Sequence, residues 1–304
     1  MRRKSWDNLR EEIDRCRMIY PDMKDAEEMI RLVLQAEKDF YRDYPRAMEP
    51  VHFGWSEEEI KEKFKDDQTL GMDRLEIETN SFKELLSYLA GALSGSNREL
   101  EGALEEMKER INFRLPVVSE YTTLEEAGMM FEDIEKETSL EQDLATFLFH
   151  FSLSSLFQRR MELLLSEIDT TMWRRGDCPV CGQKPHYGML RKEDGAKIME
   201  CWLCGTRYQH MRVKCPFCDS ENKDEIGLFT AANLKVCRVH FCKECNGYYK
   251  IFDLREYRGG EANLFVHHLA TLSHDLLAQK EGFSPGSGLE WVSDIELSGQ
   301  DHKH

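Results

Sequence analysis

Eight of the ten cysteines in this 304-residue chain form four Cys-x-x-Cys pairs between residues 178 and 245. A turn of this spacing brings two thiolates onto one ion, at about 2.3 Å each, so two pairs complete a tetrahedral four-sulfur site. The Gly or Asn that follows most of the pairs tolerates the positive φ that such a turn requires. The sequence therefore predicts two metal ions. The predicted ligands are Cys178, Cys181, Cys201, Cys204, Cys215, Cys218, Cys242 and Cys245.

The order of the pairs favours two sites built from consecutive pairs, because the gap within each couple suits a small β ribbon. The first gap contains Asp194-Gly195, which predicts a two-residue hairpin turn. An interleaved arrangement, in which the first pair joins the third and the second joins the fourth, is the alternative. The preferred sites are Cys178, Cys181, Cys201 and Cys204 for one ion, and Cys215, Cys218, Cys242 and Cys245 for the other.

The ligand set does not by itself name the metal, since four thiolates accept iron or zinc. The same geometry serves an inert structural ion or a rubredoxin-type iron that changes oxidation state. A thioredoxin-like role for one pair is disfavoured, because no pair lies between a strand and a helix of a βαβ pattern.

The remaining cysteines and a group of histidines are expected to have no chemical role. Cys237 lies in an apolar run and reads as a small buried hydrophobe, and Cys16 reads as incidental on a polar helix. We expect His267, His268 and His274 to lie on the surface or to face a partner. The sequence shows no Ser/His/Asp set, phosphate loop or paired-carboxylate site, which favours a protein that is not an enzyme.

Hydrophobic periodicity indicates the elements that position the cysteines. It predicts a mainly α N-terminal domain at 1–170, a small β module of two rubredoxin-like or zinc-ribbon-like sites at 171–260, and a C-terminal helix with a flexible tail at 261–304. Capping-box patterns occur at Ser56/Glu59, Thr123/Glu126 and Ser139/Gln142. Helices are predicted at 27–41, 82–93, 140–168 and 264–278, and strands at 187–190, 197–201, 208–213, 226–230, 234–241 and 248–254.

Charge and hydropathy limit the function classes. The net charge is −16, which disfavours a nucleic-acid binder and favours a protein partner. Residues 171–260 hold 16 Lys or Arg against 11 Asp or Glu, a formal +5, so the acidic surplus lies elsewhere. No apolar leader follows the first residues, and the apolar stretch 144–157 is too short to span a bilayer. We therefore expect a cytoplasmic protein without a membrane span.

The cysteine region resembles the formate dehydrogenase accessory protein FdhE family. The resemblance lies in the four pairs with their neighbours, in Arg212-Val213-Lys214 before Cys215, and in Tyr249-Lys250-Ile251 after the last pair. It continues through Leu269-Ala270-Thr271-Leu272 to Phe283, whereas the preceding helical region fits in size and class only. Two departures are His267-His268, where relatives often carry two Asp, and the absence of an Asn-Pro-Phe-like ending.

The resemblance implies a cytoplasmic, non-catalytic assembly factor. Such proteins bind two iron ions through these cysteines in rubredoxin-like sites, with zinc as the alternative here. They act on the catalytic subunit of a molybdenum- or tungsten-dependent formate dehydrogenase. Two other classes stay open: a zinc-ribbon nucleic-acid binder, which would use Tyr208, Phe217, Tyr248 and Tyr249 beside Arg207, Arg212 and Lys214, and a rubredoxin-like electron-transfer protein.

Overall fold

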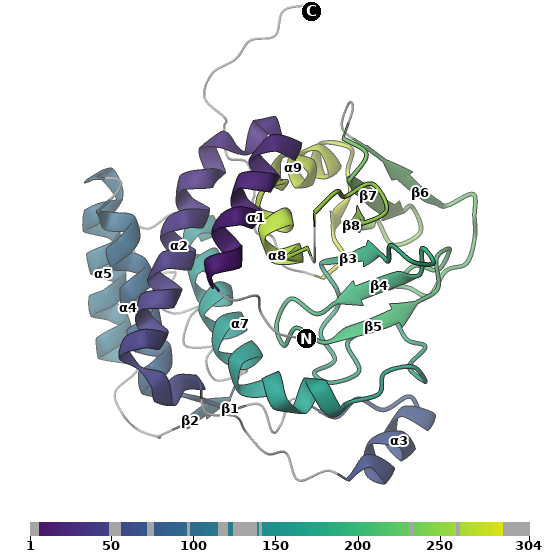
Figure 1. The fold of residues 1–304 in the computed structure, drawn as a ribbon, viewed down its shortest axis with the longest axis horizontal. Helices are drawn as coiled ribbons and strands as arrows, with labels where there is room; N and C mark the ends of the chain where they lie inside the picture. Colours follow the sequence, from purple (N-terminus) through teal and green to yellow (C-terminus); the bar gives the residue numbers. More distant parts are fainter. Residues whose placement is uncertain are drawn as a thin grey trace, which may run out of the picture.

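The computed structural model describes residues 6–48, 56–71, 76–95, 98–114, 121–123, 139, 142–230, 234–259 and 262–287. Helices form the N-terminal part, a sheet with two cysteine clusters follows, and two short helices come near the end of the described chain, which confirms the predicted fold class (Figure 1). The helices are α1 (Trp6–Ile19), α2 (Lys24–Asp43), α3 (Glu57–Lys65), α4 (Thr79–Ser94), α5 (Arg98–Arg114), α7 (Gln142–Glu167), α8 (Leu264–Leu269) and α9 (Leu272–Lys280), with 3-10 turns at Pro21–Met23 and Pro45–Met48.

The sheet joins two antiparallel ribbons through one parallel contact. Its strand order is β5-β4-β3-β8-β7-β6, with β9 added on β8, and β3 runs parallel to β8. Most strands begin and end within one or two residues of their predicted positions, although β7 starts three residues later and β5 ends three residues earlier. The strands are β3 (Tyr187–Leu190), β4 (Lys197–Glu200), β5 (Arg207–His210), β6 (Ile226–Phe229), β7 (Cys237–Cys242), β8 (Gly247–Asp253) and β9 (Ser284–Pro285), and a separate pair is β1 (Glu76–Glu78) with β2 (Tyr121–Thr123).

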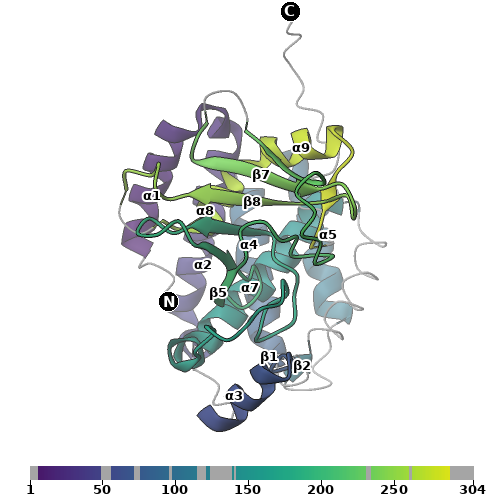
Figure 2. The ribbon, with the colours of Figure 1, turned by 90° about the vertical axis from the view of Figure 1, so that its right-hand side faces the viewer.

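Helix α8 lies between the helical layer and the sheet. It contacts α1 and α2 on one side and β3 and β8 on the other, while α9 packs against β7 and β9. Figure 2 shows the helical layer behind the sheet. One continuous cluster of buried apolar residues runs from α1 through α7 to the two ribbons. The helices and the cysteine ribbons therefore share a core.

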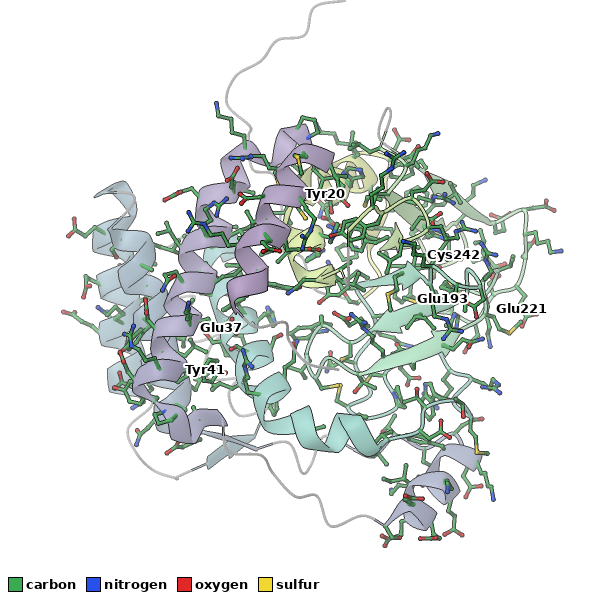
Figure 3. The ribbon with its side chains drawn as sticks, viewed as in Figure 1. Tyr20, Glu37, Tyr41, Glu193, Glu221 and Cys242 are labelled. Carbon is green, nitrogen blue, oxygen red and sulfur yellow. The ribbon has the colours of Figure 1, made fainter. Side chains whose placement is uncertain are left out.

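Helix α7 carries buried serines, and two of them, Ser154 and Ser155, hydrogen-bond to neighbouring elements. Ser155 donates to Glu37 at 2.6 Å and bonds the Tyr41 hydroxyl at 2.9 Å. Glu37 and Tyr41 extend from α2 in Figure 3. The Ser154 hydroxyl donates a hydrogen bond of 2.8 Å to the Trp202 carbonyl of the cysteine ribbon.

Among the described residues, no helix combines the length and the apolar character that a membrane span requires.

The turn and cap predictions were correct in part. Ser56 and Glu59 form the predicted capping box at the start of α3. The turn around Asp194-Gly195 is not a two-residue hairpin, because Arg191 N bonds Ala196 O at 2.9 Å and encloses a longer loop. Glu126 lies outside the described residues, whereas the Ser139 hydroxyl donates to Glu106 at 2.8 Å.

The predicted single helix at 264–278 is wrong, because the chain forms α8 and α9 with a break at Ala270 and Thr271. The ammonium group of buried Lys250 donates to the carbonyls of His268 at 2.9 Å and Thr271 at 3.2 Å. The Thr271 hydroxyl donates to His267 O at 2.8 Å. Since these side chains satisfy the last carbonyls of α8, the helix ends there.

Candidate metal centres

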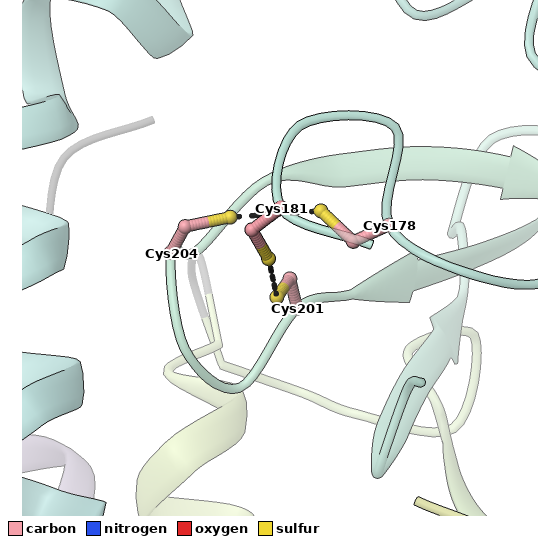
Figure 4. A group of neighbouring side chains, drawn as sticks. All are labelled: Cys178, Cys181, Cys201 and Cys204. Carbon is pink, nitrogen blue, oxygen red and sulfur yellow. Dashed lines mark hydrogen bonds between the residues drawn. The ribbon is translucent and has the colours of Figure 1, made fainter. Parts of the chain in front are cut away.

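Site 1 gathers the first two cysteine pairs in one compact cluster (Figure 4). The four sulfur atoms of Cys178, Cys181, Cys201 and Cys204 lie within 4.8 Å of one another. Two sulfur pairs are 3.6 Å and 3.4 Å apart. A tetrahedral ion with metal–sulfur bonds of about 2.3 Å needs sulfur atoms about 3.8 Å apart, whereas a disulfide needs about 2.05 Å. The observed spacing fits an ion held by four thiolates.

Site 2 repeats this arrangement with the third and fourth pairs. The sulfur atoms of Cys215 and Cys245 lie 3.7 Å apart, as do those of Cys218 and Cys242. All four lie within 4.8 Å of one another. The structure therefore groups consecutive pairs rather than the interleaved ones.

The turns within the pairs follow from local backbone geometry. The residue after each second cysteine has a positive φ: 73° at Gly182, 74° at Gly205, 62° at Asp219 and 54° at Asn246. In the first turn, Cys178 N donates to Gln183 O and Gly182 N donates to Cys178 O, both at 2.9 Å. Such turns direct backbone N–H groups at sulfur, as Phe217 N does toward the Cys215 sulfur at 3.5 Å.

The electrostatics of site 1 explain why a cation is needed to hold four thiolates. Burial raises the pKa of the Cys181 and Cys201 thiols well above their usual range. Burial also acts against ionisation of Cys204, but hydrogen bonds from the neighbouring thiols and from Thr206 bring its pKa below the usual value. Without metal, burial opposes ionisation of Cys181 and Cys201, although a metal ion binds both sulfur atoms as thiolates. Metal binding must therefore release protons.

Cys237 and the three histidines of α8 and α9 are all buried. Cys237 is fully buried, as predicted for a small hydrophobe. The expectation that His267, His268 and His274 lie on the surface or face a partner is wrong, because all three side chains are buried: α8 lies between two helices and the sheet, and α9 packs against β7 and β9. Sequence periodicity offered a hint, since these histidines share their helices with core leucines.

Cys16 is also buried, in a network that the sequence did not reveal. Its sulfur lies near the carboxylate of Glu12 and the ring of His267. Glu12 accepts hydrogen bonds from Arg15 at 2.6 Å and Tyr257 at 2.9 Å, and its other oxygen lies 3.1 Å from His267 Nε2. These contacts fasten α1 to α8. Sequence reasoning could not predict these contacts, because Glu12 and His267 are 255 residues apart.

The aromatic residues of the nucleic-acid alternative do not form an exposed stacking surface. The rings of Tyr208, Tyr248 and Tyr249 are buried. The Tyr208 hydroxyl donates to Gly176 O at 2.7 Å, and Phe217 packs edge-on against Tyr249. Base stacking requires accessible ring faces, so this arrangement disfavours single-strand recognition.

Comparison with known proteins identifies relatives of the cysteine region. A family model described as "FdhE, central domain" matches residues 177–212. The "Protein FdhE homolog" of Aquifex aeolicus is 31% identical over 149 residues, which cover 47% of this chain and 52% of that protein. "Protein FdhE" of Escherichia coli K12 is 24% identical over 178 residues, covering 52% and 56%. The chain thus matches about half the length of these relatives.

The fold extends the likeness over nearly the whole chain. The crystal structure of the FdhE protein from Pseudomonas aeruginosa covers 96% of this chain and 98% of its own, with a TM-score of 0.59 and 18% sequence identity. At that identity the match establishes a shared fold. The family model falls on site 1, and the sequence relatives and the structural neighbour carry the same name, so the comparisons support the FdhE family for this chain.

Proposed function

We propose that this protein is a cytoplasmic accessory factor that binds the catalytic subunit of a molybdenum- or tungsten-dependent formate dehydrogenase and supports its maturation. The observation that carries the proposal is the pair of four-sulfur clusters in a chain whose sequence relatives carry the FdhE name. In this proposal all eight clustered cysteines are metal ligands. Iron is the proposed metal at both sites, and zinc is the alternative.

The coordination supports an accessory rather than a catalytic role. A catalytic zinc site keeps one position open for water or substrate, with three protein ligands. Each cluster here offers four sulfur atoms at distances that fit a complete tetrahedron. An ion bound in this way orders the ribbons and, if it is iron, can also change oxidation state. It has no vacant position at which to activate a substrate.

The charge distribution is consistent with a protein client. The ribbon region is formally +5 before metal binding, and the rest of the chain is formally −21 with 25 Lys or Arg against 46 Asp or Glu. Opposite charge on two parts of one surface favours oriented association with a large partner. A maturing catalytic subunit is the client that the family assignment suggests.

Two measurements test the proposal. The chain, purified without oxygen, should contain two metal ions and, if they are iron, show thiolate-to-iron absorption on oxidation. It should also co-purify with the formate dehydrogenase catalytic subunit, and so should Cys237→Ala, a control that removes a thiol outside both clusters. Metal-loaded protein that captures no catalytic subunit under reducing or oxidising conditions would refute the client assignment.

An electron carrier is the second candidate, favoured by one feature of site 2. Its Cys218 and Cys245 side chains are exposed, so an iron there would lie close to a docked redox partner. A reversible reduction potential with no capture of the catalytic subunit would support this candidate instead.

A further inference from the structure

The two clusters differ in exposure although they share one ligand geometry. In site 1 all four cysteines are buried. In site 2 Cys215 and Cys242 are buried, whereas Cys218 and Cys245 are exposed. The second cysteine of each pair in site 2 therefore faces solvent. A competing ligand can approach that site without any opening of the fold.

The turns of site 1 are fastened to the helical layer. The Trp202 carbonyl, between two ligands, accepts from Ser154 at 2.8 Å and from Gln158 at 3.2 Å, both on α7. The Pro179 carbonyl, between the other two, accepts from Leu70 N at 3.0 Å. Release of an ion from site 1 thus requires movement of turns that belong to the shared core.

The turns of site 2 are held by bonds within the ribbons and by one bond from β9, in which Ser284 N donates to Asn246 O at 2.9 Å. Lys243 N donates to Glu225 O at 2.9 Å, and the Lys214 ammonium pairs with Asp219 at 2.9 Å. Beneath them, Lys197 donates to Lys214 O at 3.1 Å. Figure 3 places Cys242 on the side of the molecule away from α2. Local motion of the ribbon can therefore open site 2 without disturbing the helices.

We propose that the two sites have different tasks: site 1 keeps its ion as part of the fold, while site 2 exchanges its ion with external thiol or chelating ligands at Cys218 and Cys245. The step is ligand substitution without a change in oxidation state. An incoming donor binds the ion as one cysteine sulfur leaves, and the released thiolate takes a proton from water. The inference rests on the proposed metal binding of both clusters and is independent of the formate dehydrogenase client.

Metal release gives the first test. Protein loaded with two Zn²⁺ is mixed with excess 4-(2-pyridylazo)resorcinol, and the coloured chelate is followed over time. We expect one ion to leave at least about tenfold faster than the other, because local opening precedes opening of the core. Cys218→Ser removes a ligand of site 2, so the fast phase should disappear and a single slowly released ion should remain. Cys237→Ala, which changes no ligand, should keep both phases.

Thiol mapping supplies a second test that does not depend on a variant. The zinc-loaded wild-type chain is treated briefly with N-ethylmaleimide and its labelled cysteines are identified by mass spectrometry. Cys218 and Cys245 should be labelled before the cysteines of site 1. Cys16 and Cys237, which are buried and outside both four-cysteine sites, report global unfolding in the same sample.

The outcomes separate the two proposals. Fewer than two ions per chain would refute metal binding at both clusters and with it the exchange proposal. Two ions that leave at one rate, or site 1 cysteines labelled as fast as Cys218 and Cys245, would refute the difference between the sites while leaving the metal assignment intact. Fast labelling at Cys218 and Cys245 with one retained ion would support exchange at site 2.

Discussion

The ion pair between Lys250 and Asp275 allows the effect of burial on stability to be measured directly. Both side chains are buried, and Lys250 Nζ lies 2.5 Å from the carboxylate of Asp275. The change Asp275→Asn keeps the shape of the side chain and an acceptor for Lys250 but removes the negative charge. The ammonium group then remains buried with uncharged acceptors only, the Asn amide oxygen and the carbonyls of His268 and Thr271.

The expected cost follows from that geometry. Removing one partner of a buried pair costs about 3–5 kcal/mol, and the two remaining carbonyls place this case at about 3 kcal/mol. In a chain of this size, 1 kcal/mol corresponds to a melting-temperature change of about 2–4 °C, so a decrease of about 6 °C or more is expected. This decrease is measured by thermal unfolding of the metal-loaded wild type and variant, monitored by circular dichroism.

A matched control lies in the turn between β3 and β4. Arg191 and Asp194 also approach to 2.5 Å, but both side chains are about half exposed. Asp194→Asn makes the same chemical change, and water screens the charge that it removes. We expect no measurable change in melting temperature. Equal effects of the two substitutions would show that burial does not determine the strength of these pairs.

Three further predictions concern pH, packing and metal. Burial lowers the pKa of His150 and His274 to about 4, so only the unfolded chain binds these protons between about pH 6.5 and pH 4. The unfolding free energy should therefore fall with decreasing pH in this window by up to about 3 kcal/mol per histidine, and His274→Leu should reduce the slope in urea titrations. A Cβ at Gly176 would lie 2.0 Å from Pro216 O, in the first turn of site 2, so Gly176→Ala should destabilise the fold by about 1–3 kcal/mol and speed zinc release there. In contrast, a Cβ added at Gly102 on α5 would have no atom within 4 Å, so Gly102→Ala should be neutral or stabilising. Similar rates of zinc release from the two variants would contradict this packing argument. Chelation of both ions should lower the melting temperature and disorder the cysteine ribbons while most helical circular dichroism remains, and complete loss of that signal would show that the helices depend on the metal sites.

The sequence by itself determined the features that depend on neighbouring residues. Two residues between cysteines and a Gly, Asp or Asn after them specify each turn, because a short backbone segment fixes where both sulfur atoms point. Short strand-like runs located the strands, and the helical period located α2 and α4. The consecutive grouping of the pairs followed from the length of the ribbons between them.

Tertiary structure decided what depends on contacts between distant segments. The parallel pairing of β3 with β8 and the burial of His267 against Glu12 join residues far apart in the chain, which no local pattern records. Lys250 ends α8 because folding brings its ammonium group to the carbonyls of the helix. Packing of distant segments also makes the two metal sites differ. The same Cys-x-x-Cys spacing yields one cluster of four buried cysteines bonded to α7 and one cluster with two exposed cysteines, since exposure is a property of the packed chain.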